Sequence, residues 1–336
     1  MIDVSIIIVN YKTPQLILDC LQSVYAHTKG VDFEVIVVDN ESQDNSRALV
    51  LAQYPDVRWL DMGYNAGFSR ANNLGIDQAT GRNILLLNSD TLLIDDLLTR
   101  LAGVLDNQPD VAAVGAMQIN REGDVHYQIF DTFGKIRRHF YIVPQSNFFR
   151  KLLYKAIPDT HYDDPNEVDW LSGACIMTRP SVIEKAGKLN DSFFMYGEDV
   201  EWGHRLGKQG RMLMLRDAFV VHLEFGSSDT YQQHIPTHIN RFKTQAQVSN
   251  LLWIRKQYGI GAYLFLIFHY LTLVPIIFLW KISVNLHNRQ PLLGDLDTQK
   301  RFARQVGTYL RFLPDTLLNR KGFYKVVETQ DFASLR

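Results

Sequence analysis

The stretch ILLLNSDTLL, residues 84–93, joins a short apolar run to an abrupt polar end. The run 84–87 has the character of a strand that is buried on both faces, and Asn88, Ser89 and Asp90 follow it directly. Open α/β sheets bind ligands at the carboxyl ends of their strands. The stretch therefore predicts a central strand at whose end Asp90 either binds a metal or simply closes the strand as a polar residue.

Other apolar runs upstream extend this pattern to a whole sheet. Runs at 4–9 and 33–38 are rich in β-branched residues, and a shorter run lies at 57–60. Helical spacing after Pro14, and a Gly- and Asn-rich loop at 63–81 that leads into a short helix, separate these runs. Strand–helix alternation of this kind predicts an α/β fold with a mostly parallel, doubly wound sheet. Glycines with dinucleotide-fold or P-loop spacing are absent from the sequence.

Length and composition describe an ordinary folded protein. The chain has 336 residues, 46% of them hydrophobic and 21% charged, which suits one large α/β domain with an appendage or two modest domains. Both cysteines, Cys20 and Cys175, lie in apolar surroundings and are expected to be buried free thiols, as in a reducing compartment. The first apolar run is too short for a secretory signal, which is not expected.

Charge and hydropathy change near the C-terminus. Residues 237–336 contain 14 Lys/Arg and 5 Asp/Glu, which leaves 21 and 31 of the chain's 35 and 36 for residues 1–236. This basic region contains an uncharged stretch, 257–280, and predicts a membrane-associating segment at about 260–283. A buried core helix is the alternative. Basic flanks on both sides favour an in-plane or hairpin segment on the cytoplasmic leaflet, and no nucleic-acid partner is expected.

Three acidic or amide clusters fall at predicted strand ends, at 39–40, 88–90 and 198–199. They belong to a series of motifs that resembles family 2 glycosyltransferases of the GT-A fold, in the rhamnosyltransferase-like branch. The resemblance covers residues 3–255 and implies a GT-A catalytic domain at 1–236, with a nucleotide-sugar-binding half at 1–115 and an acceptor and catalytic half at 116–236. Residues 237–336 would form a helical, apolar and basic extension. The motifs are SIIIVNYKTP, VVDNESQDNS, GYNAGFSRANNLGI, LLLNSDT, DWLSGACIMTR, FFMYGEDVEWGHRLGKQG and VVHLEFGSS.

The resemblance implies a divalent cation, Mg²⁺ or Mn²⁺, that stabilises the leaving diphosphate. The metal-binding D-x-D element of the family appears here as Asn88-Ser89-Asp90, so Asp90 keeps the expected carboxylate and Asn88 replaces the first one with a neutral amide. His222 matches a histidine that completes the metal site in relatives, and an ordinary strand-end histidine is the alternative. Lower metal affinity is expected because the amide contributes no charge.

The same resemblance assigns the nucleotide-sugar site. Asp39 would hold the base or ribose, although a turn or helix-cap aspartate explains it as well. Small and amide residues of the loop permit a close backbone approach to the nucleotide. Arg205 suits phosphate geometry, and a surface or ion-pair arginine is its alternative. The nucleotide-sugar-binding residues expected are Asn10, Tyr11, Asp39, Asn65, Gly67, Phe68, Asn73, Asn88 and Arg205.

Inverting transfer needs a base that takes the proton of the attacking hydroxyl. Asp199 is the residue expected in this role, and Glu198 would orient the site or contact the acceptor. Two acidic residues at a helix N-terminus are the structural alternative. Trp170, Ser172 and Gly173 match the element that shapes the acceptor pocket, where an indole would stack on a sugar, although tryptophan is also a common core residue.

Together these features predict an inverting, metal-dependent hexosyltransferase. It would move a sugar, with rhamnose as a candidate, from a nucleoside-diphosphate sugar to a lipid-linked or surface-polysaccharide acceptor. The protein would be peripheral or monotopic at the cytoplasmic face of the inner membrane. Two alternatives remain at this stage: a non-catalytic binding or scaffold protein with the same fold, for which Asn88 speaks, and a sugar nucleotidyltransferase, for which a triphosphate-binding loop is missing after the first strand.

Overall fold

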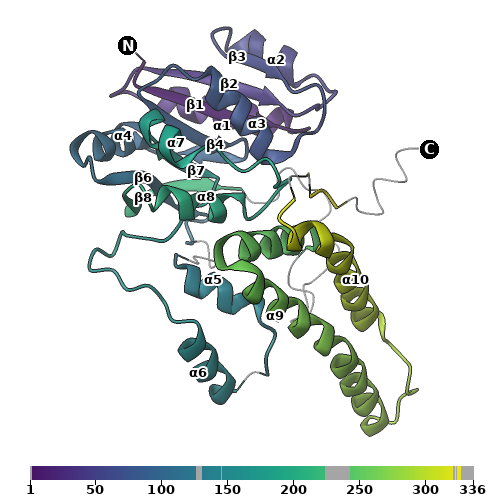
Figure 1. Cartoon of the computed structure of the whole chain (residues 1–336). Helices are drawn as coiled ribbons and strands as arrows, with labels where there is room; N and C mark the ends of the chain where they lie inside the picture. Colours follow the sequence, from purple (N-terminus) through teal and green to yellow (C-terminus); the bar gives the residue numbers. More distant parts are fainter. Residues whose placement is uncertain are drawn as a thin grey trace. The chain divides into compact units, whose positions relative to one another are not determined.

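A computed structural model of the chain describes residues 2–125, 131–144, 146–223, 243–320, 322 and 324–326 (Figure 1). The chain divides into two compact units. The first contains the described residues of 1–137, 154–190 and 198–233, and the second contains those of 138–153, 191–197 and 234–336. Two short segments of the predicted 1–236 catalytic region therefore group with the C-terminal region, and the predicted boundary itself lies outside the described residues.

One mixed sheet of eight strands organises the first unit, in the order β3-β2-β1-β4-β7-β6-β8-β5. The strands β3, β2, β1 and β4 run parallel to one another, and β7 is antiparallel to both β4 and β6. β8 runs parallel to β6 and antiparallel to β5. The strands are β1 Val4–Asn10, β2 Phe33–Asp39, β3 Arg58–Asp61, β4 Asn83–Asn88, β5 Thr91–Leu93, β6 Val111–Ile119, β7 Cys175–Thr178 and β8 Arg211–His222.

Strand register places the polar strand ends side by side. Asn10 pairs with Asp39 across β1 and β2, while Val9 pairs with Asn88 across β1 and β4. Because these three strands are parallel, their carboxyl ends meet at one edge of the sheet. The apolar runs behind these ends are buried, as the sequence predicts for central strands.

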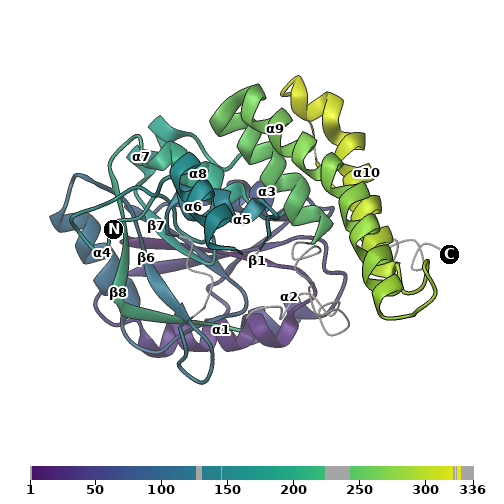
Figure 2. The same ribbon diagram turned by 90° about the horizontal axis from the view of Figure 1, so that it is seen from below.

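Helices cover both faces of the sheet. Ile6 and Ile8 of β1 join one hydrophobic cluster together with Leu21, while Ile7, between them, joins a second cluster together with Ala71. Figure 2 accordingly shows α1 and α3 on opposite sides of β1. The helices are α1 Pro14–His27, α2 Ser46–Gln53, α3 Gly67–Gln78, α4 Leu97–Asn107, α5 Phe133–Phe140, α6 Asn147–Ala156, α7 Pro180–Ala186, α8 Glu198–Leu206, α9 Thr244–His287 and α10 Asp297–Leu317.

The second unit is a helical pair with an aromatic core. α9 bends at Gly259, whose φ of 83° is a conformation that side-chain-bearing residues rarely adopt. Beyond the bend, Tyr270 is buried with its ring centroid 5.7 Å from that of Tyr309 and 6.3 Å from that of Phe302, both on α10. These contacts hold α10 along one side of α9.

The predicted fold class is confirmed. The chain has an α/β architecture with a mixed sheet, helices on both faces and an apolar helical C-terminal extension. The four N-terminal strands fall where the apolar runs predict them, except that the third spans Arg58–Asp61 rather than 57–60. The sheet is more mixed than predicted, because β7 and β5 are short strands that return antiparallel beside β4 and β8.

Candidate active site

The turn between β4 and β5 brings Asp90 beside His222. Thr91, the first residue of β5, pairs with His222 of β8, and the amide of Leu223 donates to the carbonyl of Asp90 at 2.9 Å. Asp90 Oδ1 and His222 Nε2 are consequently 3.3 Å apart, with side chains that are only 10% and 14% exposed. The last residues of the motif VVHLEFGSS, 224–228, lie outside the described residues.

Gln118 fixes how His222 presents its ring. Gln118 Oε1 lies 2.9 Å from His222 Nδ1, so Nδ1 carries the proton and donates it. The other ring nitrogen, Nε2, then faces the Asp90 carboxylate and lies 3.4 Å from Asn88 Nδ2. A neutral imidazole would point its lone pair at an anionic oxygen, an arrangement that a cation between the two groups stabilises. A carboxylate and an imidazole on this spacing fit Mn²⁺, since Mg²⁺ prefers oxygen ligands throughout.

The protein supplies few charged ligands for such a cation. Among the residues that the structure describes, no group of three or more His, Cys, Asp or Glu side chains comes together. Asn88 stands next to the pair and contributes a neutral amide. Metal affinity should therefore depend strongly on the charge at position 88.

Asn88→Asp is expected to lower the apparent Kd for Mn²⁺ by about tenfold, because an added carboxylate attracts the cation at short range. Mn²⁺ titration followed by calorimetry measures the change. Asn107→Asp, the same substitution at an exposed position of α4, is the matched control and should leave the Kd unchanged. An Asn88→Asp variant with unaltered Mn²⁺ affinity would show that the cation does not bind here.

Asn10, Asp39 and Ser42 form a closed hydrogen-bond network at the ends of β1 and β2. Asn10 Nδ2 donates to Asp39 Oδ1 at 2.9 Å and to Ser42 Oγ at 3.0 Å. Ser42 in turn donates from its amide to Asp39 Oδ2 at 2.9 Å and from its hydroxyl to Oδ1 at 2.6 Å. Both carboxylate oxygens of Asp39 therefore hold the turn at 39–42, and its contact with the nucleotide stays a prediction.

The neighbouring loop is tied to this turn by Asn40. Asn40 Nδ2 donates to Asn65 Oδ1 at 3.0 Å, and its Oδ1 accepts from the Ala66 amide at 2.8 Å. Gly67 follows at the start of α3 with a φ of 76°, which a larger residue would adopt only under strain. At the end of β1, Tyr11 is partly exposed and the Nζ of Lys12 lies 5.2 Å from its ring centroid.

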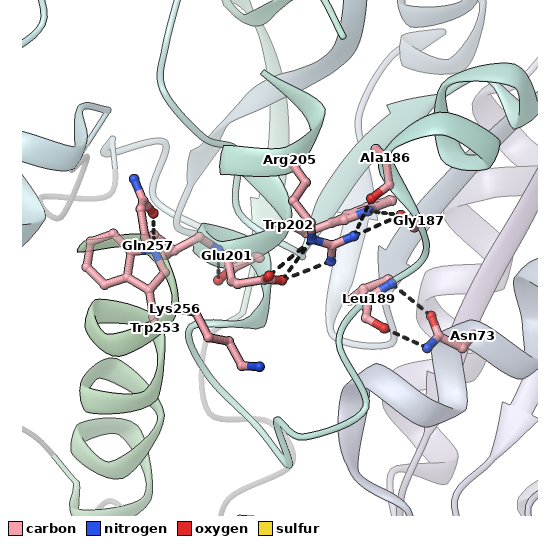
Figure 3. Close-up of polar contacts among 12 residues, drawn as sticks. Asn73, Ala186, Gly187, Leu189, Glu201, Trp202, Arg205, Trp253, Lys256 and Gln257 are labelled. Carbon is pink, nitrogen blue, oxygen red and sulfur yellow. Dashed lines mark hydrogen bonds and ion pairs between the residues drawn. The ribbon is translucent and has the colours of Figure 1, made fainter. Parts of the chain in front are cut away.

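Asn73 forms two hydrogen bonds with the backbone of another segment. Its Nδ2 donates to the Leu189 carbonyl at 2.8 Å and its Oδ1 accepts from the Leu189 amide at 3.0 Å (Figure 3). A side-chain amide that pairs with both backbone groups of one residue fixes the segment after α7 to α3. The nucleotide contact expected of Asn73 stays a prediction.

Glu198 is buried and Asp199 is partly buried at the start of α8, and the two carboxylates differ in their partners. Asp199 Oδ2 accepts from the Gly173 amide at 3.1 Å and Oδ1 accepts from its neighbour Val200 at 2.8 Å. Burial raises the pKa of Asp199, and these backbone donors oppose the rise. Burial raises the pKa of Glu198 well above its ordinary value, and the charge of Asp199 adds to the effect. We therefore assign the proton to Glu198 and the negative charge to Asp199.

Glu198→Gln is expected to stabilise the protein at pH 8 and to leave stability unchanged at pH 4. A raised carboxyl pKa gives full stability below the ordinary value of 4.5 and loses it as the pH rises toward the folded value. Each pKa unit corresponds to about 1.4 kcal/mol, and Gln removes this loss. Urea unfolding at both pH values measures it. Glu201→Gln, which removes the ion-pair partner of Arg205, should destabilise instead. Equal effects of Glu198→Gln at both pH values would contradict the assignment.

Gly173 connects the predicted acceptor element to the base and to the loop. A Cβ at this position would lie 3.1 Å from the Phe68 ring and 3.7 Å from Asp199 Cβ. The carbonyl of the next residue, Ala174, accepts a hydrogen bond from the backbone amide of Asn88 at 3.1 Å. The predicted nucleotide loop, acceptor element, base and metal ligand thus lie around one short segment of chain.

Trp170 and Ser172 flank this segment in the sequence. Trp170 is partly buried and packs on the second hydrophobic cluster, where Gly203 leaves it room. Ser172 is partly exposed and its Oγ accepts weakly from the Ala174 amide at 3.4 Å. Their contacts with an acceptor stay predictions.

Arg205 forms hydrogen bonds with a carboxylate and two backbone carbonyls within the first unit (Figure 3). Its guanidinium donates to Glu201 from Nε and from Nη2, the latter at 2.8 Å, and Nη1 donates to the carbonyls of Ala186 at 2.6 Å and Gly187 at 3.1 Å. This is the ion-pair alternative that the sequence left open. The diphosphate contact stays a prediction.

Sequence reasoning did not select Ser42 or Gln118. Ser42 lies inside the quoted motif VVDNESQDNS, where an Asp followed three residues later by Ser is a turn signal. Gln118 carries no local signal, because only the parallel pairing of β6 with β8 brings it to His222.

Comparison with known proteins identifies the group to which this architecture belongs. Residues 5–168 match the family model described as glycosyl transferase family 2. A low-salt glycan biosynthesis hexosyltransferase of Haloferax volcanii is 31% identical over 212 residues, 62% of each chain. An O-antigen biosynthesis protein of Myxococcus xanthus is 29% identical over 67% of this chain and 17% of its own length.

Further similarity extends to an N-acetylglucosaminyl-diphospho-decaprenol L-rhamnosyltransferase of Mycobacterium tuberculosis, 28% identical over 52% of this chain and 61% of its own length. The chain thus covers less than two thirds of each of these relatives. Among solved structures, Staphylococcus aureus TarS has a TM-score of 0.48 at 19% identity, covering 66% of this chain and 36% of that one. A Pyrobaculum calidifontis mannosyltransferase has 0.49 at 14% identity, covering 100% and 81%.

The family model covers both the strand ends at 10, 39 and 88–90 and the loop at 63–75. Over residues 5–168 the chain is similar to glycosyl transferase family 2, and the curated relatives support the same family resemblance.

Proposed function

We propose that the protein transfers a sugar from a nucleoside-diphosphate donor to a glycan acceptor with inversion at the anomeric carbon. The observation that carries this proposal is the pair of carboxylates held around one segment. Asp199 accepts the amide of Gly173, and the next residue accepts the amide of Asn88, two positions before Asp90. The proposed base Asp199 and Asn88, two residues before the proposed cation ligand, therefore both form hydrogen bonds with the segment 173–174.

The reaction follows from these positions. The acceptor oxygen forms a bond to the anomeric carbon as the bond from that carbon to the diphosphate oxygen breaks, and Asp199 takes the acceptor's proton. Neutral Glu198 leaves Asp199 as the ionised member of the pair. A divalent cation, bound through Asp90 and His222, would supply charge stabilisation to the leaving diphosphate. The buried network of Asn10, Asp39 and Ser42 would keep the nucleotide end of the site rigid.

A panel of nucleotide sugars tests this proposal directly. We expect at least one donor to bind in the presence of Mn²⁺ and to be hydrolysed slowly without an acceptor. The panel consists of uridine, guanosine and thymidine diphosphate sugars, including thymidine diphosphate rhamnose. Failure of all of them to bind would favour a scaffold protein without activity.

We further propose a lipid-linked glycan as the acceptor and rhamnose as the first donor sugar to examine. The support is the similarity to a mycobacterial protein whose name specifies a diphospho-decaprenol acceptor and rhamnosyl transfer. The similarity to proteins named for O-antigen and glycan biosynthesis supports a surface-polysaccharide product. This acceptor class would place the protein at the cytoplasmic face of the inner membrane.

α9 supplies the features of a membrane-associating segment. Among the described residues it is the helix with the length and hydropathy of a span, with a mean hydropathy of 2.2 over an 18-residue window of which 28% is buried. Tyr263 and Tyr270 are buried, whereas Phe268, Leu279 and Trp280 are 63%, 67% and 72% exposed. Burial of one side of the helix against α10 favours an in-plane position over a span.

Replacing Phe268, Leu279 and Trp280 with Ser is expected to move at least half of the protein from the membrane to the soluble fraction. The substitutions remove exposed apolar area and leave the aromatic core of the second unit intact, which truncation near residue 256 would not. Ultracentrifugation of lysates measures the distribution. The double variant of Ile94 and Val125 to Ser, which are 47% exposed in the first unit, is the matched control. Unchanged distribution of the α9 variant would refute in-plane insertion.

A further inference from the structure

α6, residues 147–156, is an amphipathic helix whose apolar face is exposed or only partly covered by the described residues. All ten of its residues are described, and none is buried. At 3.6 residues per turn, the apolar side chains of the sequence NFFRKLLYKA gather on one side of the helix and the basic ones on the other. Phe148 is 70% exposed and Leu152, one turn later, is 52% exposed. The apolar face consists of Phe148, Phe149, Leu152, Leu153 and Ala156.

The charged residues of α6 and of the chain next to it are basic, although Lys135 forms an ion pair with Asp131 and Arg138 is buried. Between Thr132 and Pro158 the chain contains six Lys or Arg residues and no Asp or Glu. Two of the three basic residues within α6, Lys151 and Lys155, flank the apolar face, where long stems allow their charges to reach outward from it. A helix that combines an exposed apolar face with only basic charged residues complements an anionic lipid surface, in which apolar chains lie beneath negative headgroups. The six are Lys135, Arg137, Arg138, Arg150, Lys151 and Lys155.

The chain before α6 is fixed within the second unit. The amide of Ile142 donates to His269 Nε2 of α9 at 3.1 Å, and the hydroxyl of Tyr270 donates to the carbonyl of Phe140 at 2.7 Å. Tyr141 lies with its ring centroid 6.1 Å from that of Phe265, which is 62% exposed. The chain therefore leaves α9 at its uncharged stretch and reaches α6 within a few residues.

We propose that α6 is an interfacial helix that inserts its apolar face into the headgroup region of an anionic bilayer. This contact is separate from sugar transfer and needs no nucleotide or cation. It predicts that α6 contributes to membrane binding in addition to α9, and that its contribution depends on anionic lipid.

Fluorescent labelling of the full-length protein tests the insertion. Phe148→Cys is labelled with an environment-sensitive dye in the folded state, in which Cys20 and Cys175 are buried and burial raises the pKa of both thiols to about 12. Vesicles of phosphatidylcholine that contain about 30% phosphatidylglycerol have a strongly negative surface. They are expected to increase the emission of the dye several-fold. Lipids with brominated acyl chains should then quench it. Tyr154→Cys, on the polar side of the same helix, is the matched control and should show little quenching.

Charge reversal provides the second variant. Lys151→Glu with Lys155→Glu should raise the vesicle concentration for half-maximal signal by about tenfold or more, since each basic residue near an anionic surface contributes to binding. Lys151→Arg with Lys155→Arg should keep it. The proposal would be overturned if the dye at position 148 were not quenched, or if the protein bound equally well to pure phosphatidylcholine vesicles. An increase in dye emission that required a soluble protein partner and not lipid would also overturn it. Donor hydrolysis is expected to be unaffected by the charge reversal, which separates this result from a failure of the proposed transferase function.

Discussion

Asp199→Asn is expected to lower the rate of sugar transfer about 10²–10⁴-fold, which is the usual contribution of general-base catalysis. The amide keeps the size of the side chain, and its single oxygen can replace one of the two carboxylate oxygens that accept from Gly173 and Val200. Donor affinity should therefore change by less than about threefold, because the substitution acts on the reacting hydroxyl and not on the nucleotide. Single-turnover rates and donor titrations measure the two quantities separately.

Glu198→Gln is the matched control, and it sharpens this expectation. Burial and the charge of Asp199 raise the pKa of Glu198 well above its ordinary value, which favours the neutral form of the wild-type side chain. A neutral amide of the same shape should then preserve transfer to within about fivefold, because no charge is lost. If Glu198→Gln abolished transfer and Asp199→Asn did not, the two residues would have the opposite roles.

Asp90→Ala is expected to abolish Mn²⁺-dependent turnover, with a loss of about 10²-fold or more in kcat/KM. Asp90 supplies the carboxylate of the Asp90–His222 pair, and the neighbouring Asn88 side chain carries no charge. Asp19→Ala removes one carboxylate from the surface of α1 and should have no effect. Activation by Mn²⁺ that persists in Asp90→Ala would place the cation elsewhere.

Much of the sheet could be predicted because buried parallel strands have a plain signature. The apolar runs that end at Asn10, Asp39 and Asn88 are continuous, and each stops at a polar residue. The proximity of Asp90 and His222 could not be predicted in this way, because no local sequence pattern at either residue indicates it. The short strand β5 creates it by pairing antiparallel with the end of β8, and the prediction rested on resemblance to a family.

The remaining features depend on contacts between residues that are distant in sequence. Gln118 reaches His222 only because β6 pairs with β8, and Asn73 is occupied by the backbone of Leu189 after α7. Residues 138–153 and 191–197 group with α9 and α10 by tertiary packing, which a boundary at 236 could not anticipate. Arg205 shows the same limit, since the carbonyls that hold it come from Ala186 and Gly187.

The direct measurement is transfer of a radiolabelled sugar from a nucleotide-sugar panel to a membrane lipid extract, with Mn²⁺ or with a chelator. We expect label in the lipid fraction with Mn²⁺, an inverted anomeric configuration in the product, and loss of both in Asp90→Ala and Asp199→Asn. Transfer that is equally fast with the chelator, or in Asp199→Asn, would contradict the roles assigned to these two carboxylates.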